Sequence, residues 1–149
     1  MTREMALFDT LALAGSEDQP FEYIKVVPNA KGTMDVAQEQ RKTLEGTALG
    51  LAFNEHKDHI YTLNDPEIKQ YADLKAWYTM GEQSSYIVPL IAGGECLGVL
   101  HVGSRERRVL IESEMQALVL RTSQLVASSV QNARLFNQAV NLQILNRSV

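Results

Sequence analysis

The side chains that could do redox, metal or cofactor chemistry in this chain are one cysteine and three histidines. Cys96 stands alone, so it can neither form an internal disulfide nor complete a cysteine-based zinc cluster. His56 and His59 flank the start of a predicted strand, where solvated histidines are common. His101 lies inside a predicted strand, where a buried neutral imidazole needs a partner that a ligand could provide. We find no Ser-His-Asp spacing, metal-binding His/Glu cluster or phosphate loop, so the sequence indicates a domain that is not an enzyme.

The composition is typical of a single soluble domain spanning residues 1–149. Hydrophobic residues make up 45% of the chain and charged residues 21%, both ordinary values for a globular fold. The net charge of -4 argues against a nucleic-acid surface, because phosphate binding needs a concentrated basic patch. The sequence contains neither an apolar run of about 20 residues nor a signal peptide. We therefore expect a cytoplasmic domain with no direct membrane insertion.

The strongest local pattern is a predicted hairpin between Gly81 and Ser104, with the sequence GEQSSYIVPLIAGGECLGVLHVGS. The segment from Ser84 to Ile91 alternates and is rich in β-branched and aromatic residues. Gly93 and Gly94 supply the positive φ angles of a tight turn. The return strand is predicted from Leu97 to Val102.

The elements that must position this hairpin follow from periodicity and from turn residues. Met5–Ala14 and Phe21–Val27 are most simply paired as two strands, and His59–Leu63 is a further strand candidate. Val36–Asn54 has a helical pattern, in which Gly46 and Gly50 indicate a close backbone approach. A second helix is predicted from a cap at Asp65 to about Tyr78.

A long helix is predicted from about Glu112 to the end of the chain, with residues 137–149 continuing toward an output domain. Its small and apolar residues recur at alternating steps of four and three, which is a heptad-like seam. We expect this seam to form a homodimer. The candidate dimer residues are Met115, Val119, Thr122, Val126, Ser129, Ala133, Phe136 and Val140.

Three of these segments resemble a known family, the GAF domains. The hairpin is similar to the last hairpin of that family, Thr43–Asp65 resembles its helix-then-strand element, and Ser113–Phe136 resembles its closing helix. The resemblance implies an α+β fold with a curved antiparallel sheet of about six strands. A helical bundle would cover one face, and shorter helices would close a ligand pocket on the other. A PAS domain is the structural alternative, although it lacks a counterpart to the hairpin motif.

The family's well-marked cofactors find no match in this sequence. The motif of many cyclic-nucleotide binders cannot be threaded through Asn64–Glu82. Covalent bilin attachment would need a cysteine near Tyr71–Met80, and none is there. Haem would need an axial ligand, for which His101 alone is a weak candidate. We therefore leave the cofactor unknown, with neither a covalent bilin nor a haem signature.

Strand alternation predicts which side of the hairpin would meet a ligand. Tyr86, Val88, Leu90, Leu100 and Val102 should pack against the long helix. The opposite side mixes polar and apolar side chains, as small-molecule pockets do, and the resemblance points to the same side. The candidate ligand-binding residues are Tyr61, Tyr71, Leu74, Trp77, Tyr78, Ser85, Ile87, Val99 and His101.

Two functions fit these expectations. The first is a regulatory GAF domain that senses a small molecule in a signalling protein, such as a sensor kinase or cyclase, and transmits the ligand state through a dimeric C-terminal helix. The second is a ligand-free dimerisation scaffold with the same fold, whose pocket is filled by Trp77, Tyr78 and Tyr71.

Overall fold

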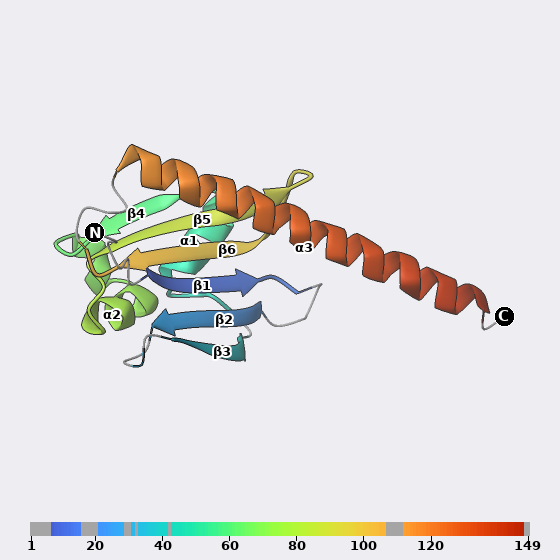
Figure 1. Ribbon diagram of the computed structural model, residues 1–149, viewed down its shortest axis with the longest axis horizontal. Coiled ribbons are helices and arrows are strands. Elements are labelled where there is room, and N and C mark those ends of the chain that lie inside the picture. The colour runs from blue at the N-terminus through green and yellow to red at the C-terminus, as the bar shows by residue number, and fades with distance from the viewer. Residues whose placement is uncertain are drawn as a thin grey trace.

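A computed structural model of the protein describes residues 7–15, 21–28, 31, 33–41, 43–106 and 112–147. The described chain is an α+β fold with one antiparallel sheet and helices on both of its faces (Figure 1). Its elements are β1 (Leu7–Leu13), β2 (Phe21–Pro28), β3 (Met34–Arg41), α1 (Ala48–Glu55), β4 (His59–Thr62), the 3-10 helix η1 (Pro66–Lys69), α2 (Ala72–Thr79), β5 (Ser84–Ala92), β6 (Glu95–Ser104) and α3 (Ser113–Arg147).

The six strands lie in the order β3-β2-β1-β6-β5-β4. The predicted pairing of the first two strands is confirmed, with Asp9 opposite Val26. The predicted hairpin is confirmed as β5 and β6, and Gly93 and Gly94 form its turn with φ angles of 60° and 76°. These positive angles favour glycine because a side chain would strain the backbone there.

The prediction of a helix over Val36–Asn54 is wrong in its first part. Residues Met34–Arg41 form strand β3, and the helix begins only at Ala48. The polar residues of β3 could lie on a solvated helix or on a solvated edge strand, and pairing with β2 selects the strand. The close approach predicted at Gly46 and Gly50 is present only at Gly50, where a Cβ would lie 2.2 Å from the Leu44 carbonyl oxygen. At Gly46 the prediction is wrong, because a Cβ there would meet no described atom within 4 Å.

The second predicted helix is interrupted. The chain forms the short η1 and then α2, and the break falls at Gln70 and Tyr71. Asp65 does not cap η1 with its side chain. Its carboxylate instead accepts a hydrogen bond of 2.7 Å from the backbone N–H of Thr62 at the end of β4.

The sheet carries a separate hydrophobic cluster on each face. One cluster joins β5 and β6 to α3 and contains Tyr86, Val88, Leu90, Leu100, Val102, Val119 and Ala127. The other lies under α1 and α2 and includes Ala48, Leu49, Leu74, Trp77, Ile87 and Val99. This division confirms that the side of the hairpin predicted to meet the long helix does so.

Helix α3 is longer than the sheet that it covers. Its 35 residues span about 52 Å at 1.5 Å per residue, whereas the ten residues of β6 span about 33 Å. Figure 1 shows its C-terminal part extending beyond the strands. Among the described residues, no helix combines the length and the apolar character that a membrane crossing requires.

Asp9 should make the stability of the fold depend on pH. Its burial raises the pKa of the carboxyl above the ordinary 3.8, and a positive charge on His101 opposes this increase only partly. A raised pKa in the folded state means that the stabilising contribution of the protonated form is complete below pH 3.8 and is lost as the pH rises through the folded-state value.

We therefore expect Asp9→Asn to be more stable than the wild type at pH 7, since the asparagine has no charge to desolvate. The gain should shrink as the pH falls toward 3.8. Urea unfolding at both pH values measures it, with Glu95→Gln at the exposed start of strand β6 as the control. An equal effect of Asp9→Asn at the two pH values would contradict this explanation.

Candidate functional site

The structure brings the nine candidate ligand-binding residues to one face of the sheet. Five of them belong to the cluster under α1 and α2, while Tyr71 and Tyr78 pack against its margin. Ser85 and His101 are fully buried, and the strand register places them on the same side as Ile87. The five clustered residues are Tyr61, Leu74, Trp77, Ile87 and Val99.

The centre of this face is a buried pair that joins β6 to the segment after α2. The Nε2 atom of His101 lies 2.7 Å from Oε1 of Glu82, and it donates a hydrogen bond when the carboxylate is ionised. Both side chains have 0% exposure. Removing one member of such a pair leaves the other polar and buried, which costs far more than losing a surface ion pair.

Gly103 makes room for this pair. A Cβ at position 103 would lie 1.5 Å from Oε1 of Glu82 and 3.0 Å from Nε2 of His101. The carboxylate thus occupies the space that any other residue at this position would fill. The glycine requirement arises from close approach, because position 103 lies inside the regular strand β6.

Trp77 covers the imidazole from α2. The indole and imidazole rings are 6° from parallel, and their centres are 3.6 Å apart. The indole of Trp77 is itself nearly buried. A ligand that reached this face of His101 would therefore have to displace Trp77, which requires a shift of α2.

A short hydrogen-bond chain ties α2 to β4 and β5. The Tyr78 hydroxyl lies 2.7 Å from the Ser85 hydroxyl and donates to the Tyr61 carbonyl oxygen at 3.1 Å. Burial raises the pKa of Tyr78 above its ordinary value. The phenol therefore stays protonated and holds the C-terminal half of α2 against the sheet.

Four buried polar atoms on this face have no hydrogen-bond partner within the described part of the chain. They are Nδ1 of His101, Oε2 of Glu82, the hydroxyl of Tyr61 and Nε2 of His59, whose strand register places it opposite Ile87. Unpartnered buried polar atoms are rare in folded proteins and are costly. Their presence on one face is the feature that most clearly sets it apart from an ordinary hydrophobic core.

Sequence reasoning missed two acidic residues that build the site. Asp73 is buried, and its carboxylate accepts hydrogen bonds from the N–H groups of Ala48 and Leu49 at 2.8 and 3.0 Å. It thus neutralises the N-terminus of α1 and ties α1 to α2. Glu82 follows Gly81, so it resembles a solvated loop residue, and only its closeness to the hairpin could have drawn attention to it.

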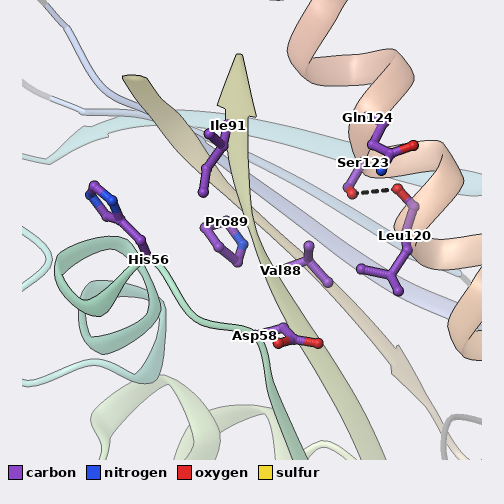
Figure 2. Close-up of a pocket in the computed structure, with 8 residues that line it drawn as sticks. All are labelled: His56, Asp58, Val88, Pro89, Ile91, Leu120, Ser123 and Gln124. Atoms are coloured by element: carbon purple, nitrogen blue, oxygen red, sulfur yellow. Dashed lines mark hydrogen bonds between the residues drawn. The ribbon is translucent and has the colours of Figure 1, made fainter. Parts of the chain in front are cut away.

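A separate groove lies at the other side of β5, between the segment before β4 and helix α3 (Figure 2). Its volume is about 420 Å³. Asp58 lies at one wall and accepts a 2.6 Å hydrogen bond from the Tyr86 hydroxyl. The groove contains none of the nine candidate residues. It is lined by His56, Asp58, Val88, Pro89, Ile91, Leu120, Ser123 and Gln124.

The predicted dimer seam divides between the two halves of α3. Met115, Val119 and Val126 pack against β5 and β6 of the same chain. Thr122 and Ser129 are exposed, and each returns a hydrogen bond to the carbonyl four residues earlier. Ala133 and Phe136 are also exposed, and Val140 is half-buried. The part of the seam that faces away from the chain's own core is therefore mainly its C-terminal part.

Metal and thiol chemistry find little support in the described part of the chain. No three His, Cys, Asp or Glu side chains there lie close enough together to hold a metal ion. Cys96 is half-buried, and its burial raises the pKa of the thiol. A raised pKa reduces the thiolate fraction and hence the reactivity of this cysteine.

A double-mutant cycle should show strong coupling between Glu82 and His101. We expect Glu82→Ala and His101→Ala each to lower the free energy of unfolding by about 3–5 kcal/mol, and the double variant to lose much less than the sum.

The matched control is the Glu55–His59 pair, which has the same residue types, a 3.8 Å separation and greater exposure. Its coupling should be about 0.5 kcal/mol or less. Urea denaturation of both sets measures the two couplings, and equal values would refute the special role of the buried pair.

Comparison with known proteins places this geometry in a known fold. No protein-family model matches the sequence, and no curated protein matches it. The chain is similar to the GAF domain of a two-component sensor histidine kinase from Bacillus halodurans, with 15% identity, a TM-score of 0.63 and coverage of 91% of this chain and 87% of that one.

It is also similar to the GAF domain of a phosphoenolpyruvate-protein phosphotransferase from Coxiella burnetii, with 16% identity, a TM-score of 0.67 and coverage of 90% and 76%. A GAF domain region from Geobacter sulfurreducens PCA matches with 16% identity, a TM-score of 0.57 and coverage of 87% and 83%. The six-stranded sheet with helices on both faces is therefore a GAF-like fold.

Proposed function

We propose that this chain is a regulatory GAF domain of a signal-transduction protein, and that it senses a small molecule on the sheet face under α1 and α2. The fold supports a regulatory role, because two similar domains come from a sensor histidine kinase and a phosphotransferase. On this proposal the chain is a cytoplasmic binding module and not an enzyme.

The observation that carries the proposal is the set of unpartnered buried atoms on His101, Glu82 and Tyr61. A carboxylate oxygen accepts hydrogen bonds, while a ring nitrogen and a phenol can accept or donate. A small polar molecule with at least two hydrogen-bond donors would satisfy the carboxylate oxygen and Nδ1 of His101, which accepts because Nε2 donates to Glu82. A flat apolar portion would suit the surrounding aromatic side chains.

Ligand entry would act on α2. Trp77 stacks on His101 and Tyr78 is bonded to Ser85, so a ligand beside the imidazole would move the helix that carries both aromatic residues. Asp73 on α2 also holds the N-terminus of α1. A displacement of α2 would therefore reach α1 and the sheet, and through β5 and β6 it would reach α3.

A second function, the ligand-free dimerisation scaffold, is favoured by a different observation. Trp77 fills the space over His101, and the side chains of Leu74, Ile87 and Val99 around it have no solvent exposure. In this alternative the face is a packed core, and the buried pair serves only to fix the position of α2.

The two functions can be distinguished by thermal unfolding against a panel of polar heteroaromatic and amine metabolites. The sensor predicts that at least one compound raises the melting temperature. Tyr61→Phe removes one unpartnered hydroxyl at little cost to the fold, and it should reduce this shift. His101→Ala should abolish it.

Tyr86→Phe is the control, because Tyr86 lies on the opposite face of the sheet and bonds Asp58. It should leave the ligand-dependent shift unchanged. A panel without any stabilising compound, or a shift that both His101→Ala and Tyr61→Phe leave intact, would favour the scaffold.

We also propose that a homodimer forms through the C-terminal half of α3. Phe136 on this seam is 69% exposed, and a helix that extends beyond its own domain is marginal in water without a partner. The seam residues Ser129, Ala133, Phe136 and Val140 would then meet their counterparts in the second copy.

Replacing Phe136 and Val140 with glutamate should shift the protein toward the monomer mass, because two apolar contacts per chain would become like charges. Light scattering across a concentration series measures this change. Gln138→Glu is exposed and lies about 200° around the helix from Phe136, so it should leave the mass unaltered. An unchanged mass for the double variant would exclude this seam.

A further inference from the structure

Strand β3 forms an outer edge of the described six-stranded sheet. Among the described strands it pairs only with β2, and the side chains from Asp35 to Gln40 are all exposed. The β2–β3 register runs from Phe21 opposite Arg41 to Pro28 opposite Met34 without a bulge. Edge strands usually carry a lysine, a proline or a bulge that prevents further pairing. The eight residues of β3 contain no lysine or proline.

The charges of β3 all lie on one face. Strand alternation places Asp35, Glu39 and Arg41 on the same side as Tyr23, which is opposite Glu39 in β2. Val36, Gln38 and Gln40 lie on the other side and carry no charge. On one face of β3, charges would therefore determine how another strand can pair with it. The side chains on the other face would add no charge interaction.

We propose that β3 pairs with β3 of a second copy of this chain, antiparallel and centred on Gln38, to make one continuous sheet across two subunits. In this register each Asp35 faces Arg41 of the second copy, and this attraction occurs twice because the arrangement is symmetric. Val36 faces Gln40, Ala37 faces Glu39, and the two Gln38 side chains face one another.

The neighbouring registers are disfavoured by the same charges. Facing residues must lie on the same face of the sheet, so the register can shift only in steps that preserve this alternation. Centring the pair on Ala37 would place Asp35 against Glu39 twice. Centring it on Glu39 would place the two Glu39 carboxylates against each other. Like charges directly opposite one another destabilise a strand pair.

Arg41 is held in position for such a contact. Its guanidinium bonds Glu39 through Nε and Nη2, each at 2.8 Å, and lies 4.3 Å above the ring of Tyr23. A guanidinium has five N–H donors, so it can bond Glu39 within its own chain and Asp35 of the second copy together. The ring and the neighbouring carboxylate limit its motion, which lowers the entropy cost of the contact.

This interface is independent of the α3 dimer. β3 lies at the edge of the sheet, whereas α3 packs on β5 and β6, so the two surfaces are separate (Figure 1). Variants at one surface should leave the other intact, and neither the sensing proposal nor the α3 seam has to be correct for this one to hold.

The first test uses disulfide crosslinking of the full chain with Cys96→Ser, so that only introduced thiols react. Gln38→Cys should form a disulfide-linked dimer under mild oxidation, since directly opposed residues in antiparallel strands have Cα atoms about 4.5–5.5 Å apart. Val36→Cys and Gln40→Cys should crosslink poorly alone and well when mixed. Similar yields for all three variants alone, or none for Gln38→Cys, would overturn the register.

The second test uses charge reversal and sedimentation equilibrium, in chains that also carry Phe136→Glu and Val140→Glu. Asp35→Arg alone should weaken association at least about tenfold, because both attractive contacts become repulsive. Arg41→Asp alone should do the same. In an equimolar mixture, the arginine at position 35 of one chain faces the aspartate at position 41 of the other, so the mixture should associate more tightly than either variant.

Asp58→Arg, which lies in the groove beside α3 and away from β3, is the control for added charge and should not weaken association. Circular dichroism confirms that each variant is folded. Two variants that remain monomeric when mixed, or a parent chain that is monomeric at all concentrations, would refute the pairing of β3 with itself.

Discussion

The buried hydrogen bond between Glu82 and His101 is the constraint on which the candidate site depends. It requires glycine at position 103, because any side chain there would occupy the place of the carboxylate. It brings the segment after α2 against β6, and Trp77 then closes over the imidazole. The need for glycine at position 103, the placement of the segment after α2 and the closure of Trp77 over the imidazole thus all follow from this one hydrogen bond.

An ionisable pair is an expensive way to fill a core, because both groups lose their hydration. A purely structural role would be served as well by apolar residues of similar volume. The pair instead leaves Nδ1 of His101 and Oε2 of Glu82 without partners in the described chain. In a domain that binds and releases a small polar ligand at this position, these two atoms would form hydrogen bonds with the ligand, as the sensing proposal requires.

The sequence predicted best at β5 and β6, whose two faces are both buried and pack against different helices. Alternation in β5 and β6 was enough to separate Tyr86 and Val102 from Ile87 and His101, because side chains of successive residues point to opposite faces. The helix prediction failed at β3, where both faces are exposed and no apolar alternation exists. Glu82 and Asp73 could not be predicted, because their partners are distant in the chain and depend on how α2 packs.

Native mass spectrometry of the protein purified from its own cells under non-denaturing conditions tests the central claim most directly. The sensing account predicts a fraction of the protein carrying one small molecule, and a smaller fraction in Tyr61→Phe, which should preserve the fold. A mass equal to the chain alone in wild type and variant would contradict a ligand at His101 and would favour a packed scaffold.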